Sequence, residues 1–307
     1  MSDTEQIAFE RLAALPEGML ACPDTGAAVR VEARQLVRAE DGHCFESIEG
    51  MPALLPADFV FTEELQHEDQ FYEDDRPLES YPPSHRLAHS HARAPIAEAC
   101  EAAGINAESW ILNVGAGPGA QDLGILRGFT ENIVCIDISP KAVRRFVELE
   151  PLPCLLATAE ALPFGEGTMD AVVLSGVLHH VAGHSDMQPY LRTALRVLKP
   201  GGTLIALDPN LLYPTAPLMA AIDVVAQRIK PGWRHHVPHE RPLVPARLRR
   251  EIRAAGFEEA QLIGTSFVHN KFPWPLAKSL DAATTALAKR PGFRHFGYWI
   301  ACTARKA

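Results

Sequence analysis

The sequence lacks any long apolar run, any signal-peptide-like start and any closely spaced pair of cysteines. No uninterrupted apolar segment approaches the roughly 18–20 residues that span a bilayer. The start, MSDTEQIAFERL, has no basic stretch followed by an apolar one. We therefore expect a cytoplasmic protein without a transmembrane segment. The six cysteines are scattered without a C-x-x-C pair, which favours free thiols over a disulfide framework and predicts no metal site.

Basic residues are also scarce relative to acidic ones. The chain has 29 Lys and Arg against 38 Asp and Glu, a formal net charge of -9. This balance repels a phosphate backbone, so we expect no nucleic-acid partner and favour a small-molecule substrate. Apolar residues make up 47% and charged residues 22% of the 307 residues, which is typical of a globular chain with one large domain or two modest ones.

Residues 1–58 differ in pattern from the rest of the chain. Short apolar pieces are broken by turn signals such as Asp41-Gly42 and end at Met51 to Pro56, a spacing typical of a small β-rich module. Residues 59–91 are acidic and aromatic, then rich in proline and histidine. We interpret them as a connector able to order over a ligand.

From residue 92 onward the pattern alternates between helices and short buried strands. A helix is predicted over 95–103, and apolar strands are predicted over 110–114, 133–136, 154–156, 171–174 and 204–207. Near-continuous apolar strands separated by helices are typical of a parallel sheet covered on both faces. The sequence therefore predicts a doubly wound α/β domain over 92–307.

The tail departs from this alternation after about residue 211. It holds amphipathic segments over 218–229 and 276–288, a loop rich in histidine and arginine over 233–241, a helix over 245–255 and strands over 260–263 and 298–301. We interpret about 211–243 and 267–295 as a helical lid insertion near the substrate. Peripheral contact with a membrane is the alternative for the two amphipathic segments.

A glycine-rich turn follows the first strand of this domain. Gly115, Gly117 and Gly119 leave the backbone open to a ligand, and the helix that follows offers free N–H groups. Asp137 ends the second strand, where a carboxylate can accept both hydroxyls of a ribose. A helix N-cap before Ser139 is the alternative role of Asp137. The pattern G-x-G-x-x-G/A by itself also allows a dinucleotide-dependent oxidoreductase.

Three further motifs follow the glycine turn in order: AEALPF over 159–164, LHHV over 178–181 and LKPGG over 198–202. Together with the turn and Asp137, this ordered set resembles the class I S-adenosylmethionine-dependent methyltransferases. The resemblance implies a Rossmann-like, mostly parallel sheet of seven strands. It also implies S-adenosyl-L-methionine as the cofactor.

The resemblance further implies which residues contact that cofactor. They lie at the ends of the first four strands: Asn113, Gly115, Ala116, Gly117, Gly119, Asp137, Ile138, Thr158, Ala159, Glu160, Ser175 and Gly176. Asp137 would hold the ribose hydroxyls, with Ile138 against the adenine. Asn113 and Thr158 stand where members of the family often have acidic residues.

Residues 1–58 carry a resemblance of their own. Met19 to Gly26, followed by Phe45 to Pro56, is similar to the small zinc-ribbon-like module found beside, or fused to, some bacterial methyltransferases. The first knuckle of that module is C-x-x-C, but Thr25 takes the place of the second cysteine here. Cys22 and the nearby candidate ligands do not make up a set of four. We therefore expect the fold of the module without its zinc ion.

Methyl transfer from a sulfonium depends on alignment and exclusion of water rather than on a universal catalytic residue. A general base helps when the nucleophile is a hydroxyl. The candidates are His180, which follows the fourth strand, and His236 and His239 in the histidine-rich loop. A positioning role for His180 and a solvated, salt-bridged loop for the other two are the alternatives.

These observations predict a methyltransferase that acts on a small-molecule acceptor of hydrophobic, lipid-like, quinone-like or secondary-metabolite type. O-, N- and C-methylation are all compatible with the sequence. A dinucleotide-dependent oxidoreductase and a non-catalytic binding module on the same fold are the alternatives.

Overall fold

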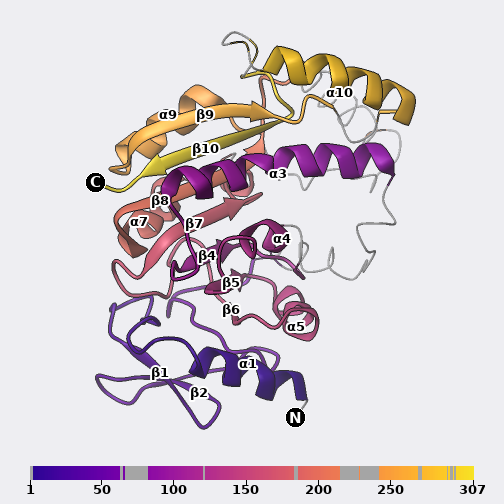
Figure 1. Ribbon diagram of the computed structural model, residues 1–307. Coiled ribbons are helices and arrows are strands. Elements are labelled where there is room, and N and C mark those ends of the chain that lie inside the picture. Colours follow the sequence, from indigo (N-terminus) through magenta and orange to yellow (C-terminus); the bar gives the residue numbers. More distant parts are fainter. Residues whose placement is uncertain are drawn as a thin grey trace.

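A seven-stranded sheet forms the centre of the protein (Figure 1). The computed structural model describes residues 3–62, 65, 82–119, 122–182, 186–214, 228, 242–268, 272–288, 290, 293 and 295–307. The strands are β4 (Ile111–Val114), β5 (Ile133–Asp137), β6 (Cys154–Leu156), β7 (Met169–Ser175), β8 (Leu198–Pro209), β9 (Glu258–Thr265) and β10 (Trp299–Arg305). Their order in the sheet is β6-β5-β4-β7-β8-β10-β9.

The predicted α/β fold with a mostly parallel seven-stranded sheet is confirmed. Strands β4 to β8 pair in parallel, whereas β10 runs antiparallel to both of its neighbours. Every residue of β4, β5 and β6 is buried, as expected for strands covered on both faces. The strand order reverses direction at β4, so the carboxyl ends of β4 and its neighbours form the crevice where such folds bind ligands.

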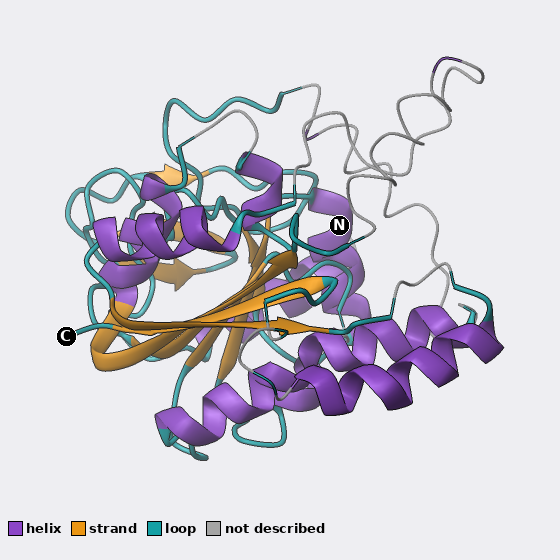
Figure 2. Ribbon diagram, turned by 90° about the horizontal axis from the view of Figure 1, so that it is seen from above, coloured by secondary structure: helices purple, strands orange, loops and turns teal. Residues whose placement is uncertain are grey.

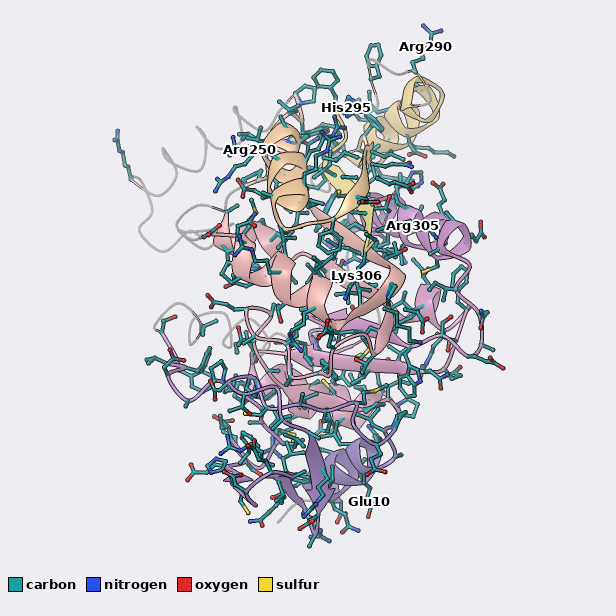
Figure 3. All side chains as sticks on the ribbon, turned by 90° about the vertical axis from the view of Figure 1, so that its left-hand side faces the viewer. Glu10, Arg250, Arg290, His295, Arg305 and Lys306 are labelled. Atoms are coloured by element: carbon teal, nitrogen blue, oxygen red, sulfur yellow. The ribbon has the colours of Figure 1, made fainter. Side chains whose placement is uncertain are left out.

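Helices cover both faces of the sheet (Figure 2). One face packs against α3 (Pro83–Ala103), α4 (Leu123–Leu126) and α5 (Pro140–Leu149), and the other against α6 (Leu178–Val181), α7 (Gln188–Val197) and α9 (Pro245–Ala254). Helix α10 (Trp274–Ala288) packs on α3. Charged side chains such as Glu10, Arg250 and Arg305 lie on the outside of the molecule (Figure 3).

Helix α3 begins at Pro83, earlier than the predicted helix over 95–103. The proline at position 95 lies inside the helix and removes one backbone donor. Packing compensates for that loss, because Ala92, Ile96 and Cys100 are fully buried on one side of α3. The helix ends at Gly104, which has a φ of 72° and donates its N–H to the last turn.

The N-terminal residues form a small unit at the β6 edge of the large sheet (Figure 1). It consists of α1 (Asp3–Ala13) and a three-stranded antiparallel sheet of β1 (Val29–Glu32), β2 (Gln35–Arg38) and β3 (Cys44–Phe45). Phe9, Leu12 and Leu20 are buried in the same hydrophobic cluster as Phe164 and the interior of the large sheet. The unit and the sheet therefore share one core.

The chain after β3 extends the large sheet by one short pairing. Ala53 forms a parallel bridge with Leu156 of β6. The N–H of Leu54 donates to the carbonyl of Leu156, and the N–H of Leu156 donates to the carbonyl of Pro52, both at 2.9 Å. Because β6 is the outermost of the seven strands, these bonds satisfy backbone groups that an edge strand would leave open.

The two cysteines of the N-terminal unit, Cys22 and Cys44, are both free thiols and differ in exposure. Cys22 is buried, Cys44 is exposed, and the guanidinium of Arg38 lies 3.7 Å from the Cys22 sulfur. Arg38 also forms an ion pair with Asp41 at 2.6 Å. Within the described ranges, no three His, Cys, Asp or Glu side chains are placed to share a metal ion. The zinc-ribbon resemblance of this unit stays a prediction.

Several predicted features lie wholly or partly outside the described residues. These are most of the connector over 59–91, the amphipathic segment over 218–229 except position 228, the loop over 233–241 with His236 and His239, and much of the expected lid over 211–243 and 267–295. Among the helices that the structure does describe, none is both long and apolar enough to cross a bilayer.

Candidate functional site

The turn after β4 needs glycine for two separate reasons. Gly115 has a φ of +68°, and a Cβ added there would lie 2.7 Å from a methyl carbon of Val177. Gly119 has a φ of +109°, and its added Cβ would lie 2.9 Å from the side chain of Glu150. At both positions, the left-handed backbone and the lack of space disfavour any residue larger than glycine. The predicted turn is thus held in one tight shape by its surroundings.

Asp137 joins this turn to the end of β5. It is buried, with 4% of its surface exposed. One carboxylate oxygen accepts the N–H of Gly117 at 2.8 Å, and the other accepts the N–H of Ser139 at 2.9 Å. The helix cap is Ser139 itself, whose hydroxyl accepts the N–H of Ala142 at 3.1 Å. The alternative prediction, that Asp137 is the N-cap of α5, is therefore wrong.

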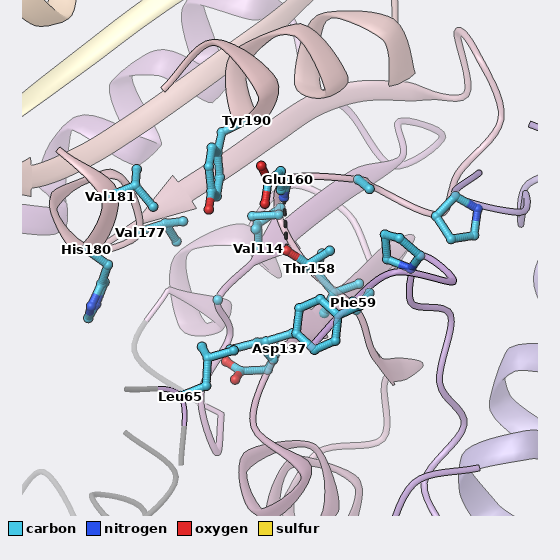
Figure 4. A pocket seen from close by; sticks show the side chains of 18 of the residues that line it. Phe59, Leu65, Val114, Asp137, Thr158, Glu160, Val177, His180, Val181 and Tyr190 are labelled. Carbon is cyan, nitrogen blue, oxygen red and sulfur yellow. Dashed lines mark hydrogen bonds between the residues drawn. The ribbon is translucent and has the colours of Figure 1, made fainter. Parts of the chain in front are cut away.

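A cavity of about 660 Å³ opens beside this turn, at the carboxyl ends of β4 to β7 (Figure 4). Its wall from the large sheet contains Val114, Gly115, Ile136, Asp137, Ile138, Ala157, Thr158, Ala159, Glu160, Ala161, Gly176, Val177, His180, Val181 and Tyr190. Its other wall comes from the N-terminal part of the chain and contains Pro23, Asp24, Pro56, Asp58, Phe59, Val60, Thr62 and Leu65.

The cavity brings together most of the residues predicted to contact the cofactor. Those that line it are Gly115, Asp137, Ile138, Thr158, Ala159, Glu160 and Gly176, together with the base candidate His180. Ala116, Gly117 and Gly119 of the glycine turn and Ser175 at the end of β7 do not belong to the lining. The other two base candidates, His236 and His239, lie outside the described residues.

Asn113 was also predicted at the cofactor, but the structure does not bring it to the cavity wall. It is buried in β4, in register with Cys135 of β5 and Val173 of β7. Those two neighbours belong to the core on the α3 side of the sheet, whereas Val114, which lines the cavity, belongs to the opposite core. The alternation of side chains along a strand accounts for this difference.

A buried histidine and aspartate pair lies next to the cavity. His179 Nδ1 is 3.0 Å from an oxygen of Asp208, and the backbone N–H of His179 donates to the same oxygen. Asp208 is fully buried at the end of β8, and burial raises the pKa of its carboxyl, while the contacts with His179 oppose that rise. The ring centroids of His179 and His180 lie 4.1 Å apart, with the ring planes inclined at 39°. Asp208 thus holds His179 in α6, the helix that also carries His180.

The ionisable side chains in the described lining of the cavity are mostly acidic. Its lining includes the carboxyl groups of Asp24, Asp58, Asp137 and Glu160, and no lysine or arginine is found among the described lining residues. A cleft lined by one sign of charge attracts ligands of the other sign. This cavity therefore favours a cationic ligand over an anionic one.

Residues 112–206 match the model of the methyltransferase domain family. The chain contains a class I S-adenosylmethionine-dependent methyltransferase domain. The match spans the glycine turn, Asp137 and the three later motifs, and it favours methyl transfer over the oxidoreductase that the glycine pattern alone also allowed. S-adenosyl-L-methionine is the methyl donor of this domain.

Curated relatives of the methyltransferase domain include two enzymes named for quinones. The chain is 30% identical over 134 residues to a ubiquinone biosynthesis O-methyltransferase of Rhizobium johnstonii, covering 44% of this chain and 52% of that protein. It is 33% identical over 114 residues to a demethylmenaquinone methyltransferase of Tropheryma whipplei, covering 36% and 46%. The chain thus spans about half the length of the curated relatives it matches.

A solved structure extends the likeness of the fold beyond the methyltransferase domain. A methyltransferase of Thermotoga maritima, described as a possible histamine N-methyltransferase, aligns with 80% of this chain and 100% of its own at a TM-score of 0.55. The two sequences are 17% identical. At this identity the comparison supports the shared fold alone.

Two features of the site are not predicted by the sequence motifs. Asp208 lies at the end of the fifth parallel strand, in Leu207-Asp208-Pro209, and an acidic residue at a strand end is the signal that could have identified it. The second wall, from Pro23 to Leu65, combines residues of the segment that resembles a zinc-ribbon-like module with the start of the connector predicted to order over a ligand, but no motif predicts which of its residues line the cavity. Its contribution depends on how the N-terminal unit packs against β6.

Proposed function

We propose that this protein transfers a methyl group from S-adenosyl-L-methionine to a small hydrophobic acceptor with a hydroxyl group, such as a reduced quinone. The observation that carries the proposal is the charge of the cavity, whose described lining holds four carboxyl groups and neither lysine nor arginine. A sulfonium cation suits this cavity, whereas the pyrophosphate of a dinucleotide would be repelled.

The residues of the cavity fit this cofactor. Gly115 leaves the turn open where any side chain would meet Val177. Asp137 presents the oxygen acceptors that ribose hydroxyls need, and Ile138 and Ala159 add apolar surface beside it. When bound, the cofactor supplies a methyl group on a positively charged sulfur, which a nucleophile can attack in line.

The end of the cavity that lies away from Asp137 supports the proposal of a hydrophobic acceptor. Val177, Val181 and Tyr190 line this end together with His180, away from Asp137 (Figure 4). Apolar side chains with a few polar groups are typical of sites for small molecules. The names of the two quinone methyltransferases among the relatives support the same class of acceptor.

His180 is our candidate for the group that takes the proton from the acceptor hydroxyl. It lines the cavity, and the Asp208–His179 pair holds the preceding residue in place. A neutral imidazole in this position would accept the proton as the oxygen attacks the methyl carbon. We also propose that His236 and His239, which lie outside the described residues, contact the acceptor.

Replacement of His180 by alanine should lower the rate of methyl transfer to a hydroxyl acceptor by about 100- to 10,000-fold. The affinity for S-adenosyl-L-methionine should not change. His91→Ala serves as the control, because this half-buried histidine of α3 lies outside the cavity lining. An unchanged rate in His180→Ala would rule out His180 as the base.

The proposed function is tested by incubation with cofactor that carries an isotopically labelled methyl group and a panel of reduced quinones. Mass spectrometry should detect the label in the acceptor, with one molecule of S-adenosylhomocysteine formed for each methyl group transferred. Absence of cofactor binding in a calorimetric titration of the intact protein would contradict the proposal.

A further inference from the structure

Residues 56–62 form part of the cavity wall, although they lie outside the segment that matches the methyltransferase family. We call them the strap. Four strap residues line the cavity besides Pro56: Asp58, Phe59, Val60 and Thr62. Val60 is 71% exposed. The strap is therefore a part of the cavity wall that comes from outside the matched segment of the methyltransferase family.

The path of the strap follows from the pairing at β6. Ala53 is bridged in parallel to Leu156, so the chain that follows leaves the sheet at the same edge as the residues after β6. Adjacent strands are about 4.8 Å apart. This spacing places the strap beside Thr158 and its neighbours, where the adenosyl end of the cavity begins.

Two contacts hold the strap in shape. Both carboxylate oxygens of Asp24 accept the N–H of Ala57, at 3.1 and 3.3 Å. The N–H of Phe59 donates to the carbonyl of Pro56 at 3.0 Å, which closes a tight turn. The anchor Asp24 belongs to the N-terminal unit, so that unit determines where Phe59 stands.

The ring of Phe59 is supported from one side. Phe61 meets it edge to face, with ring centroids 5.1 Å apart at 89°, and Phe61 itself packs against the core on the α3 side. Phe59 is half-buried and lies between Asp137 and Thr158, at the opposite end of the cavity from His180 (Figure 4). An aromatic face is thus held in place beside the carboxylate assigned to the ribose.

We propose that Phe59 stacks on the adenine of the cofactor, so that the N-terminal unit completes the nucleoside site of the methyltransferase domain. The inference rests on the proposed function. Asp137 sets the position of the ribose, and the ring attached to that ribose then falls within reach of Phe59 rather than of His180. A preformed aromatic face binds a flat base at little entropic cost, because it has few torsions to order.

The test measures calorimetric affinities for two ligands, S-adenosyl-L-methionine and methylthioadenosine, which share the adenine but not the amino-acid part. Phe59→Ala should weaken binding of both by the same factor, about 5- to 100-fold. Phe59→Trp should restore both affinities, whereas Phe59→Leu, which keeps apolar bulk without a ring face, should not. Phe45→Ala, at another half-buried phenylalanine of the N-terminal unit outside the cavity lining, is the matched control.

Three outcomes would overturn the assignment. If Phe59→Ala binds both ligands as the wild type does, while Asp137→Ala binds them weakly, the proposed function stands and the stacking role falls. If Phe59→Ala loses affinity for S-adenosyl-L-methionine only, the ring contacts the amino-acid end instead. If the wild-type protein binds neither ligand, both the function and the stacking role are contradicted. Retained binding by Phe59→Trp excludes misfolding as the cause of a loss.

Discussion

Asp137→Ala should weaken the binding of S-adenosyl-L-methionine by about 1–3 kcal/mol, roughly 5- to 150-fold. The variant loses the acceptors for the ribose hydroxyls. It also loses the carboxylate that receives the N–H groups of Gly117 and Ser139, so the glycine turn is less well held before the ligand arrives. Calorimetric titration of the intact protein with the cofactor measures the effect.

Asp170→Ala is the matched control for this experiment. Asp170 is also a carboxylate of a central strand, but it lies at the opposite end of β7, where it pairs with Lys199 at 2.7 Å and accepts the N–H of Trp110. Its loss should leave cofactor affinity unchanged while lowering stability slightly. Equal affinities of Asp137→Ala and the wild type would rule out the ribose role of Asp137.

Phe164→Ala should lower the free energy of unfolding by about 3–5 kcal/mol. Phe164 is fully buried, and the residue forms an antiparallel bridge with Leu20 of the N-terminal unit. Removal of the ring leaves a cavity between that unit and the large sheet, where two sets of side chains share one core. Urea denaturation followed by circular dichroism measures the change as a lower midpoint.

The exposed Phe293 offers a control for the Phe164 variant. Its side chain is 48% exposed, so Phe293→Ala should change the free energy of unfolding by no more than about 0.5 kcal/mol. A small effect of Phe164→Ala, similar to that of Phe293→Ala, would show that the N-terminal unit and the sheet do not depend on one another.

The central strands and the glycine turn are predictable because local sequence alone encodes them. The apolar runs over 133–136 and 154–156 have the composition that a strand buried on both faces requires, and they correspond to β5 and β6. Helix α3 is less predictable. Its proline at position 95 favours a helix start when the local sequence is taken alone, but burial against the sheet stabilises the helix on both sides of this proline.

The candidate site is also predictable from the sequence only in part. The position of Asp137 at a strand end follows from the order of motifs, because carboxyl ends of parallel strands meet at one edge. The orientation of Asn113 does not follow, since it depends on which face of β4 each side chain takes. The role of Asp208 also requires the folded chain, because 29 residues separate it from the histidine it holds.

The amino-acid sequence by itself determines the kind of domain and the position of its ligand crevice, through apolar strands, obligatory glycines and a carboxylate at a strand end. The tertiary structure alone decides that Asp24 and Phe59 reach this crevice. The sequence predicts that the connector beginning at Phe59 can order over a ligand, but it does not place either residue, because their place depends on a backbone pairing between Ala53 and Leu156, more than a hundred residues apart in the chain. Contacts of such long range arise only when the core that the two segments share is formed.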